Sequence, residues 1–250
     1  MSNAPVLSIS GRQIPPEIEE HYNKWYDAAY GPIFLKLPGS RGIDRYKIIR
    51  KNYILPNVLG LYHNGSFEAQ KKRSVNEDRA NVIRDSSITF HQIQRFWYST
   101  YELMRSFTND SSSHERIENT IVDNAPIIHI EGYKVAETEY EKYESWFNKW
   151  ASQIYIPLLL KIPGVKACNF FKLIDYKDPV YADVRFVETD MPRFVSITYL
   201  DKLESLDNFN QSTEFGAFRG SLELGFSDSL KIVWDTEYQL FASYRPPAKA

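Results

Sequence analysis

The chain alternates short, continuous apolar runs with longer segments in which apolar residues recur every three or four positions. The short runs are typical of β-strands, and the periodic segments of helices with one buried face. Strands are predicted over 5–10, 42–49, 57–63 and 93–107, and again over 125–130, 167–174, 194–200 and 230–244. Helical segments are predicted over 16–37, 66–84, 137–161 and 202–220. The predicted order is therefore β-α-β-β-α-β, twice.

The two halves also match residue by residue. Residues 23–25 read Asn-Lys-Trp, and so do residues 148–150, 125 positions later. In the last strands Trp97 matches Trp234, now 137 positions apart, which places an insertion in the second half. A period this long indicates two duplicated domains rather than an array of short repeats. We expect the four matching tryptophans to lie in the cores of the two copies.

Prolines and glycines punctuate the first helix of each copy in the same way. Pro38-Gly39 and Pro163-Gly164 follow the two helices and should end them. Pro32 and Pro157 lie inside the helical segments, where a missing backbone N–H predicts a kink or a separate last turn.

The β-α-β-β-α-β order is that of a ferredoxin-like domain, an antiparallel four-stranded sheet with both helices on one face. The other face of such a sheet is apolar and must be covered. We therefore predict an α+β protein with two tandem domains, 1–110 and 124–250, joined by a linker over 111–123. Their sheets should pack on each other as a pseudo-dimeric α+β barrel, which predicts a monomer or a weak homo-oligomer.

Composition narrows the class of protein. Of the 250 residues 43% are hydrophobic and 25% charged, which is ordinary for a soluble globular protein. A net charge of −2 gives no field for attracting nucleic acid or an anionic membrane, so neither is an expected partner. With no apolar run near 18 residues and no signal segment, we expect a cytoplasmic protein. Aromatic residues make up 15% of the chain, which favours flat side chains lining a core or a pocket.

One stretch of the first copy resembles a known superfamily. Residues 25–39, WYDAAYGPIFLKLPG, are followed by strands containing RYK and LYH. This pattern resembles the dimeric α+β-barrel superfamily, and within it the EthD-like and antibiotic-biosynthesis-monooxygenase-like branches. The resemblance implies a ligand between sheet and helices. It also implies activities such as cofactor-free oxygenation, polyketide cyclisation, decarboxylation or haem degradation. The histidine of the family's helix motif is replaced by Tyr30 and, in the second copy, by Tyr155.

Three residues of the first copy are candidates for proton-transfer chemistry. Tyr30 supplies a phenol that donates hydrogen bonds at neutral pH, and Asp27 lies three residues earlier on the same helix face. His63 ends a strand and is a natural base near neutral pH. We hypothesise that Tyr30, Asp27 and His63 meet at one pocket. The alternatives are a half-buried structural tyrosine and a strand-end histidine that faces solvent.

A second set of residues is predicted to line the ligand pockets. Tyr62 and Tyr199 match between the copies, and His129 lies in an apolar strand, where it either faces the pocket or is a core histidine. The predicted ligand-binding residues are Tyr62, Tyr155, His129 and Tyr199.

No metal or organic cofactor is predicted. The five histidines show neither HxH nor HxxxH spacing, and the single cysteine, Cys168, cannot form a sulfur site or an internal disulfide. Phosphate-binding glycine loops and a GxSxG nucleophile motif are also absent from the sequence.

Two functions fit this pattern. The first is a cofactor-independent enzyme that cyclises, dehydrates, decarboxylates or oxygenates a small apolar or aromatic, polyketide-like molecule. The second is a non-catalytic small-ligand-binding or scaffolding protein of the same fold. The absence of the motif histidine from both copies favours the second, and the aromatic content favours the first.

Overall fold

The computed structural model describes residues 4–49, 55–84, 93, 95–109, 124–179, 191–226 and 229–247. The first half contains β1 (Val6–Gln13), α1 (Pro16–Trp25), η1 (Tyr26–Tyr30), α2 (Gly31–Lys36), β2 (Ser40–Ile48), β3 (Val58–Asn64), α3 (Phe67–Ser74), α4 (Glu77–Arg84) and β4 (Arg95–Thr108). The second contains β5 (Ile127–Val135), η3 (Glu137–Glu139), α5 (Tyr140–Trp146), η4 (Phe147–Tyr155), α6 (Ile156–Leu159), β6 (Val165–Ile174), β7 (Phe194–Leu200), α7 (Glu204–Asn210), α8 (Thr213–Phe226) and β8 (Leu230–Tyr244). The predicted order is confirmed in both halves, with element ends shifted by a few residues.

The predicted proline kinks take the form of π-helical turns. Both η1 and η4 are π-helical and stand directly before the short helices that contain Pro32 and Pro157. The Gly31 N–H bonds to the carbonyl of Tyr26, five residues earlier. The wider turn accommodates a proline that cannot donate to the helix ladder. Gly39 and Gly164 then take φ angles of 77° and 93°, which an L side chain rarely adopts.

The eight strands form a closed antiparallel barrel in the order β1-β3-β2-β8-β5-β7-β6-β4. In the first half β3 pairs with both β1 and β2, and in the second half β7 pairs with both β5 and β6. The predicted α+β class is confirmed. The tandem pseudo-dimer with its sheets packed face to face stays a prediction.

The described contacts divide the chain into two compact units whose limits run through β4, β6 and β8. Unit 1 comprises Met1–Leu103, Leu173–Asp190 and Leu240–Ala250, and unit 2 comprises Met104–Lys172 and Met191–Gln239. This division differs from that of the two sequence copies, 1–110 and 124–250, which stay predicted domains. The predicted linker over 111–123 lies outside the described residues.

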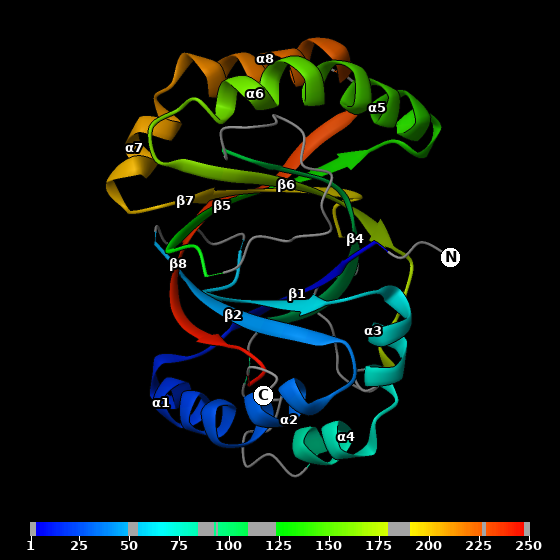
Figure 1. The fold of residues 1–250 in the computed structure, drawn as a ribbon, viewed down its shortest axis with the longest axis vertical. Coiled ribbons are helices and arrows are strands. Elements are labelled where there is room, and N and C mark those ends of the chain that lie inside the picture. Colours follow the sequence, from blue (N-terminus) through cyan, green and yellow to red (C-terminus); the bar gives the residue numbers. More distant parts are fainter. Residues whose placement is uncertain are drawn as a thin grey trace. The chain divides into compact units, whose positions relative to one another are not determined.

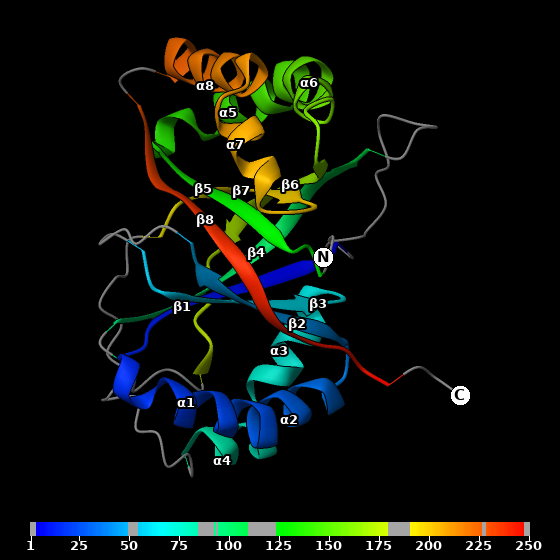
Figure 2. The ribbon, with the colours of Figure 1, turned by 90° about the vertical axis from the view of Figure 1, so that its left-hand side faces the viewer.

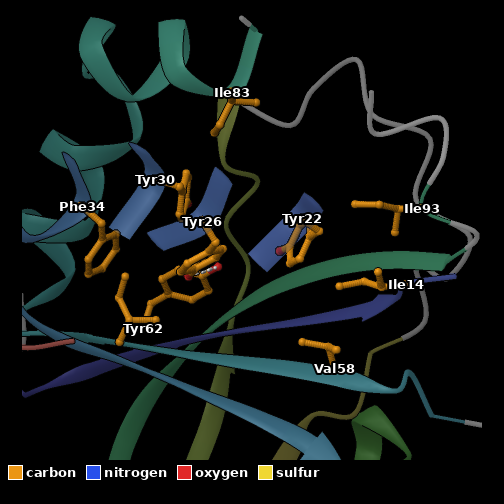
Figure 3. Packing of buried hydrophobic residues seen from close by; sticks show 10 residues of the cluster. Ile14, Tyr22, Tyr26, Tyr30, Phe34, Val58, Tyr62, Ile83 and Ile93 are labelled. Atoms are coloured by element: carbon orange, nitrogen blue, oxygen red, sulfur yellow. Dashed lines mark hydrogen bonds between the residues drawn. The ribbon is translucent and has the colours of Figure 1, made fainter. Parts of the chain in front are cut away.

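In unit 1, helices α1 to α4 lie on one face of the strands β1, β2 and β3 (Figures 1 and 2). Aromatic rings fill the space between them, as Figure 3 shows. The buried cluster consists of Ile14, Tyr22, Tyr26, Tyr30, Phe34, Ile43, Val58, Tyr62, Ile83 and Ile93. Because side chains alternate along a strand, Val58 and Tyr62 of β3 point to the helices, and the intervening odd-numbered residues point to the other face.

In unit 2, helices α5 to α8 lie on one face of β5, β6 and β7 (Figure 2). Tyr143 of α5 stacks on Phe194 of β7 with ring centroids 4.3 Å apart. Trp97 and Trp234, in units 1 and 2 respectively, are buried as predicted. The prediction of a buried Trp150 is wrong, because 54% of this residue is exposed on η4. None of the described helices is long and apolar enough to cross a membrane.

Candidate functional site

The hydroxyl of Tyr62 is the centre of a buried polar group in unit 1. It accepts a hydrogen bond from the Tyr26 hydroxyl at 3.1 Å and another from Arg12 Nη2 at 3.0 Å. Arg12 Nη1 also donates to Ser10 Oγ at 2.8 Å. We call these four residues, Ser10, Arg12, Tyr26 and Tyr62, the Tyr62 site.

The strands explain how the Tyr62 site is assembled. Ser10 and Arg12 are two positions apart on β1 and therefore share the face that meets the helices. Gly60, opposite Ser10 in the β1–β3 register, leaves room for the Tyr62 ring. A Cβ at Gly60 would lie 2.9 Å from Ser10 Oγ and 3.1 Å from Tyr62 Cε2. The tyrosine ring therefore reaches along β3 toward Arg12 only because residue 60 has no side chain.

The surroundings of Tyr62 favour its ionised form. Burial alone raises the pKa of this phenol, but the Arg12 guanidinium and hydrogen bonds from Tyr26, Ser10 and Arg12 outweigh burial and lower the pKa to about 8. Neighbouring tyrosines behave in the opposite way. Burial raises the pKa of Tyr22 to about 12, and burial followed by the charge of Tyr62 raises the pKa of Tyr26 well above its usual value.

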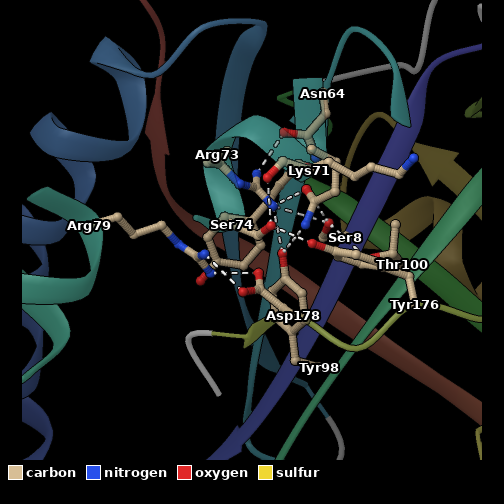
Figure 4. A network of polar contacts seen from close by, with 12 residues as sticks. Ser8, Asn64, Lys71, Arg73, Ser74, Arg79, Tyr98, Thr100, Tyr176 and Asp178 are labelled. Atoms are coloured by element: carbon tan, nitrogen blue, oxygen red, sulfur yellow. Dashed lines mark hydrogen bonds and ion pairs between the residues drawn. The ribbon is translucent and has the colours of Figure 1, made fainter. Parts of the chain in front are cut away.

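A second buried guanidinium lies beside the same aromatic cluster. Arg73 of α3 is 1% exposed and stands 4.6 Å from the ring centroid of Phe34 and 6.0 Å from that of Tyr62. It donates to Asn64 Oδ1 and to the Tyr98 hydroxyl, both at 2.6 Å (Figure 4). These partners are neutral, as are its further partners Gln70 and Ser8.

Arg79, on the next helix, differs because its partner is a carboxylate. Its Nη1 and Nη2 donate to the two oxygens of Asp178 at 3.1 and 2.9 Å, and both side chains are buried (Figure 4). The charge of Arg79 is thereby balanced, whereas the described partners of Arg73 leave its positive charge uncompensated. An anionic group is the electrostatic complement of such a position.

Two of the predicted catalytic residues belong to the first helical segment but differ in exposure. Tyr30 is buried, with its ring centroid 5.1 Å from that of Tyr26 and 6.2 Å from that of Tyr62. The Asp27 side chain is 60% exposed, lies 3.8 Å from Arg45 Nη1 and accepts a hydrogen bond from the Tyr244 hydroxyl. Tyr30 therefore borders the Tyr62 site, and Asp27 lies at the surface.

His63 lies apart from both. Its Nε2 is 2.8 Å from Asp44 Oδ2 of β2, and Asp44 also accepts hydrogen bonds from Ser243 and, at 2.7 and 2.9 Å, from Arg245. Because neighbouring residues of a strand point to opposite faces, His63 faces away from the helices that Tyr62 contacts. The hypothesis that Tyr30, Asp27 and His63 meet at one pocket is therefore corrected: His63 lies on the other face of the sheet from Tyr30. The alternative of a solvent-facing histidine is also wrong, because His63 is buried.

The environment of Asp44 stabilises its charged form. Burial raises the pKa of this carboxyl, but the hydrogen bond and charge of His63, with Arg245 and Ser243, outweigh burial and lower the pKa to about 2. Asp44 is thus a buried carboxylate that contacts His63 and Arg245 on the face of the sheet opposite the Tyr62 site.

The sheet register separates the two tyrosines that the sequence aligns. Tyr62 lies opposite Ser8, whereas Tyr199 lies opposite Ile128. The neighbouring His129 contacts the rings of Phe209 and Phe215 in α7 and α8, so Tyr199 faces away from the helices of unit 2. A shift of one residue moves a side chain to the other face, so Tyr199 is not the counterpart of Tyr62 in a helix-side pocket.

The remaining predicted ligand residues lie in unit 2. Tyr199 is buried and accepts a hydrogen bond from Asn169 Nδ2 at 3.4 Å. Tyr155 is half-buried, with its ring centroid 6.4 Å from that of Phe218. His129 is buried between the sheet and the helices, which fits both a core and a pocket position. Cys168 is also buried.

The buried arginines Arg12 and Arg73 are not predicted from the sequence pattern. Arg12 interrupts an otherwise uncharged strand, VLSISGRQ, and a charge at an inward position of a strand is a usable signal. Arg73 belongs to the Lys71-Lys72-Arg73 run, which has the composition of a solvated helix face, yet Arg73 is buried.

Solved structures resemble the whole chain. No family model matches it, and no curated protein matches it in sequence. The structure of an anthrone oxidase-like protein matches with a TM-score of 0.66 at 13% identity, covering 100% of this chain and 96% of that one. A candidate monooxygenase of Fusobacterium nucleatum matches with a TM-score of 0.62 at 9% identity, covering 98% and 96% of the two chains. A candidate monooxygenase of Lactobacillus acidophilus matches with a TM-score of 0.56 at 10% identity, covering 97% and 96%.

The fold is that of the dimeric α+β-barrel superfamily. The resemblance predicted from the sequence is thus confirmed for the fold. Identities near 10% carry no information about the reaction, because one fold supports many chemistries.

Proposed function

We propose that unit 1 is a cofactor-independent enzyme domain that removes a proton from a small aromatic molecule, with Tyr62 as the general base. The observation that carries the proposal is the pair of hydrogen bonds that the Tyr62 hydroxyl accepts from Arg12 and Tyr26. A phenol that accepts two such bonds beside a guanidinium is prepared to carry a negative charge.

The proton step is simple. Tyr62 in its phenolate form takes a proton from an acidic C–H or O–H group of the substrate and becomes a neutral phenol, while the substrate becomes an anion. With a pKa of about 8, roughly 10% of the phenol is ionised at pH 7, and a base of this strength is suited to work near neutral pH.

The arginines favour an anionic product of that step. Arg12 contacts the base directly, and the guanidinium of Arg73 is held beside the same rings by neutral partners. A substrate anion near Arg73 would gain a charge-assisted interaction that the neutral substrate lacks. Stabilisation of the ionised form more than the neutral form lowers the barrier to proton transfer.

The preferred substrate class is an aromatic molecule with a carbonyl or phenol group that acidifies a neighbouring proton. The rings of Tyr26, Tyr30, Phe34 and Tyr98 surround Tyr62, with centroids 5.2–6.2 Å away for the latter three. The names of the similar structures, anthrone oxidase-like and monooxygenase, support this substrate class by analogy only. Cyclisation, dehydration and oxygenation of such molecules each begin with loss of a proton.

A specific observation favours the second candidate function, non-catalytic binding. Tyr62 is fully buried and in contact with several rings, which is also what a structural core requires. In that case the arginines hold an anionic ligand or simply order the core. Tyr30 remains a proposed contact of the ligand in either function. Asp27 and His63 remain proposed functional residues, but they lie outside the Tyr62 site.

The test compares two tyrosine variants of the full chain. Tyrosinate absorbance is titrated with pH for the unmodified protein, Tyr62→Phe and Tyr22→Phe. Tyr22 is the matched control, because its buried hydroxyl has no hydrogen-bond partner among the described residues and its pKa is raised. We expect a step near pH 8 in the unmodified chain and in Tyr22→Phe, and no such step in Tyr62→Phe.

Turnover then separates catalysis from binding. An anthrone and a set of phenolic ketones are incubated with each variant in air and under nitrogen, and substrate loss is followed by chromatography. Loss of turnover by about 10²–10⁴-fold in Tyr62→Phe but not in Tyr22→Phe supports the base. Equal turnover in both variants contradicts the role of Tyr62. Tight binding without turnover in the unmodified chain establishes the non-catalytic function.

A further inference from the structure

Four titratable side chains of unit 2 share one face of a strand pair. His129 and Glu131 alternate along β5, and Asp235 and Glu237 alternate along β8. In the antiparallel register His129 lies opposite Glu237, and Glu131 lies opposite Asp235. Residues two apart on a strand point to the same face, so these four side chains form one cross-strand group.

The histidine of this group is buried and has no hydrogen-bond partner in the part of the chain that the structure describes. His129 is 2% exposed, with its ring between those of Phe209 and Phe215, at centroid distances of 5.2 and 5.3 Å. Neither ring nitrogen makes a hydrogen bond with any described residue. A buried imidazole with both nitrogens unsatisfied is unusual, because buried polar atoms are nearly always paired.

Both nitrogens face carboxylates at distances beyond a hydrogen bond. Nε2 lies 3.5 Å from Asp235 Oδ1, and Nδ1 lies 4.0 Å from Glu237 Oε1. His129, Glu131 and Asp235 each offer one possible ligand atom, and these three atoms lie within 4.8 Å of one another. Two ligands about 2.1 Å from one ion and 3.5 Å apart subtend roughly 110° at that ion, which is near the tetrahedral angle.

The charges of the group do not balance. Arg219 of α8 donates to Glu131 Oε1 and to Asp235 Oδ2, each at 2.7 Å. Three carboxylates and one guanidinium leave a net charge of −2 while His129 is neutral. Glu237 accepts a neutral hydrogen bond from Asn210 at 3.0 Å, which does not change that sum. Glu131 and Glu237 are buried, and uncompensated negative charge on buried carboxylates is costly unless a cation binds there.

We propose that His129, Asp235 and one of the two glutamates form a binding site for a divalent transition-metal ion, of which Zn²⁺ is the representative. His129 Nε2 and Asp235 Oδ1 are the first two ligands. The third ligand is either Glu237, or Glu131 after one of its oxygens gives up a hydrogen bond from Arg219 or Tyr133. Mixed imidazole and carboxylate ligands favour Zn²⁺, Ni²⁺ or Cu²⁺ over Mg²⁺ and Ca²⁺. Arg219 remains on the outer oxygen of Asp235 and orients that carboxylate.

The site is independent of the proposed function of unit 1, since its residues belong to unit 2 alone. The absence of HxH and HxxxH spacing predicts no metal, but ligands donated by two paired strands need no such spacing. The relevant pattern is His-x-Glu on one strand and Asp-x-Glu on its neighbour.

Titration of the chelator-treated full chain with Zn²⁺, followed by calorimetry, tests the proposal. The absorption spectrum of bound Co²⁺ gives a second readout. We expect one ion per chain, and affinity at least about 10-fold weaker in Asp235→Asn and His129→Gln. Asp235 is half exposed, so its variant is the safer one for folding. His21→Gln and His63→Gln are the matched histidine controls and should bind the ion normally.

Two results overturn the proposal. One is equal affinity in the unmodified chain, Asp235→Asn and the histidine controls, which assigns the ion to other groups. The other is no binding together with an NMR spectrum in which His129 carries protons on both ring nitrogens. In that case the group is an imidazolium paired with carboxylates, and the two unsatisfied nitrogens are donors to them.

Discussion

Arg12 Nη2 donates a hydrogen bond to the Tyr62 hydroxyl at 3.0 Å, and the two residues are 50 positions apart in the chain. Both side chains are buried between the sheet and helices of unit 1. In such surroundings a guanidinium and a phenolate stabilise each other more than they would in water, because the surrounding dielectric is low. The pair therefore links the stability of unit 1 to the ionisation of one tyrosine.

Replacement of Arg12 should raise the pKa of Tyr62. In Arg12→Gln the positive charge is lost and burial dominates, so the pKa should rise from about 8 to above the usual value near 10. Tyrosinate absorbance titrated with pH measures the change. Arg12→Lys keeps the charge and should give an intermediate value. An unchanged step near pH 8 in Arg12→Gln would mean that another cation lowers the pKa.

The same pair predicts how stability depends on pH. The folded-state pKa of Tyr62, about 8, lies below the unfolded value near 10. Between these values the unfolded chain binds more protons, so the free energy of unfolding should rise with pH, by on the order of 2–3 kcal/mol. This contribution is complete above pH 10 and is lost as the pH falls through 8. Urea unfolding across this range should show the slope in the unmodified protein and its absence in Tyr62→Phe.

Asp44 predicts a loss of stability at the acidic end of the pH range. Its folded-state pKa of about 2 lies below the usual aspartate value of 3.8, so the stabilisation is present above pH 4 and lost as the pH falls through 2. Acid unfolding followed by circular dichroism should therefore show a smaller pH dependence between pH 4 and 2 in Asp44→Asn. Asp27→Asn is the control, because that side chain is mostly exposed. Parallel acid transitions in the unmodified protein and Asp44→Asn would contradict the prediction.

The sequence predicted the elements well because hydrophobic period and proline or glycine signals are local. Tyr62 and His63 show what local signals do not contain. They are neighbours on one predicted strand, yet Tyr62 contacts helices and His63 contacts Asp44 on the other face. The face of the sheet on which each side chain lies depends on the strand register, and the register is set by partner strands far along the chain.

Burial of charge was the other missed feature. Arg73 stands in a basic run that resembles a solvated helix face, and Trp150 stands in an apolar helix pattern that resembles a core. The structure reverses both, with Arg73 buried and Trp150 exposed. A side chain's rotation about its helix is set by packing against the sheet. For Trp150, in the π-helical η4, the hydrophobic period of an α-helix does not determine this rotation, because a π-helix has more than 3.6 residues per turn.

The buried pair of Arg79 and Asp178 gives the sharpest stability prediction. Both oxygens of Asp178 accept hydrogen bonds from Arg79, and both side chains are 1% exposed. Removal of one partner takes this ion pair from the buried charge of the other, so Asp178→Asn and Arg79→Met should each lower the free energy of unfolding by about 3–5 kcal/mol. The double variant Arg79→Met with Asp178→Leu removes both charges and should recover much of that loss. Urea unfolding of the three variants measures the coupling. If the double variant loses as much as the two single losses together, the partners act independently and the ion pair does not carry the stability.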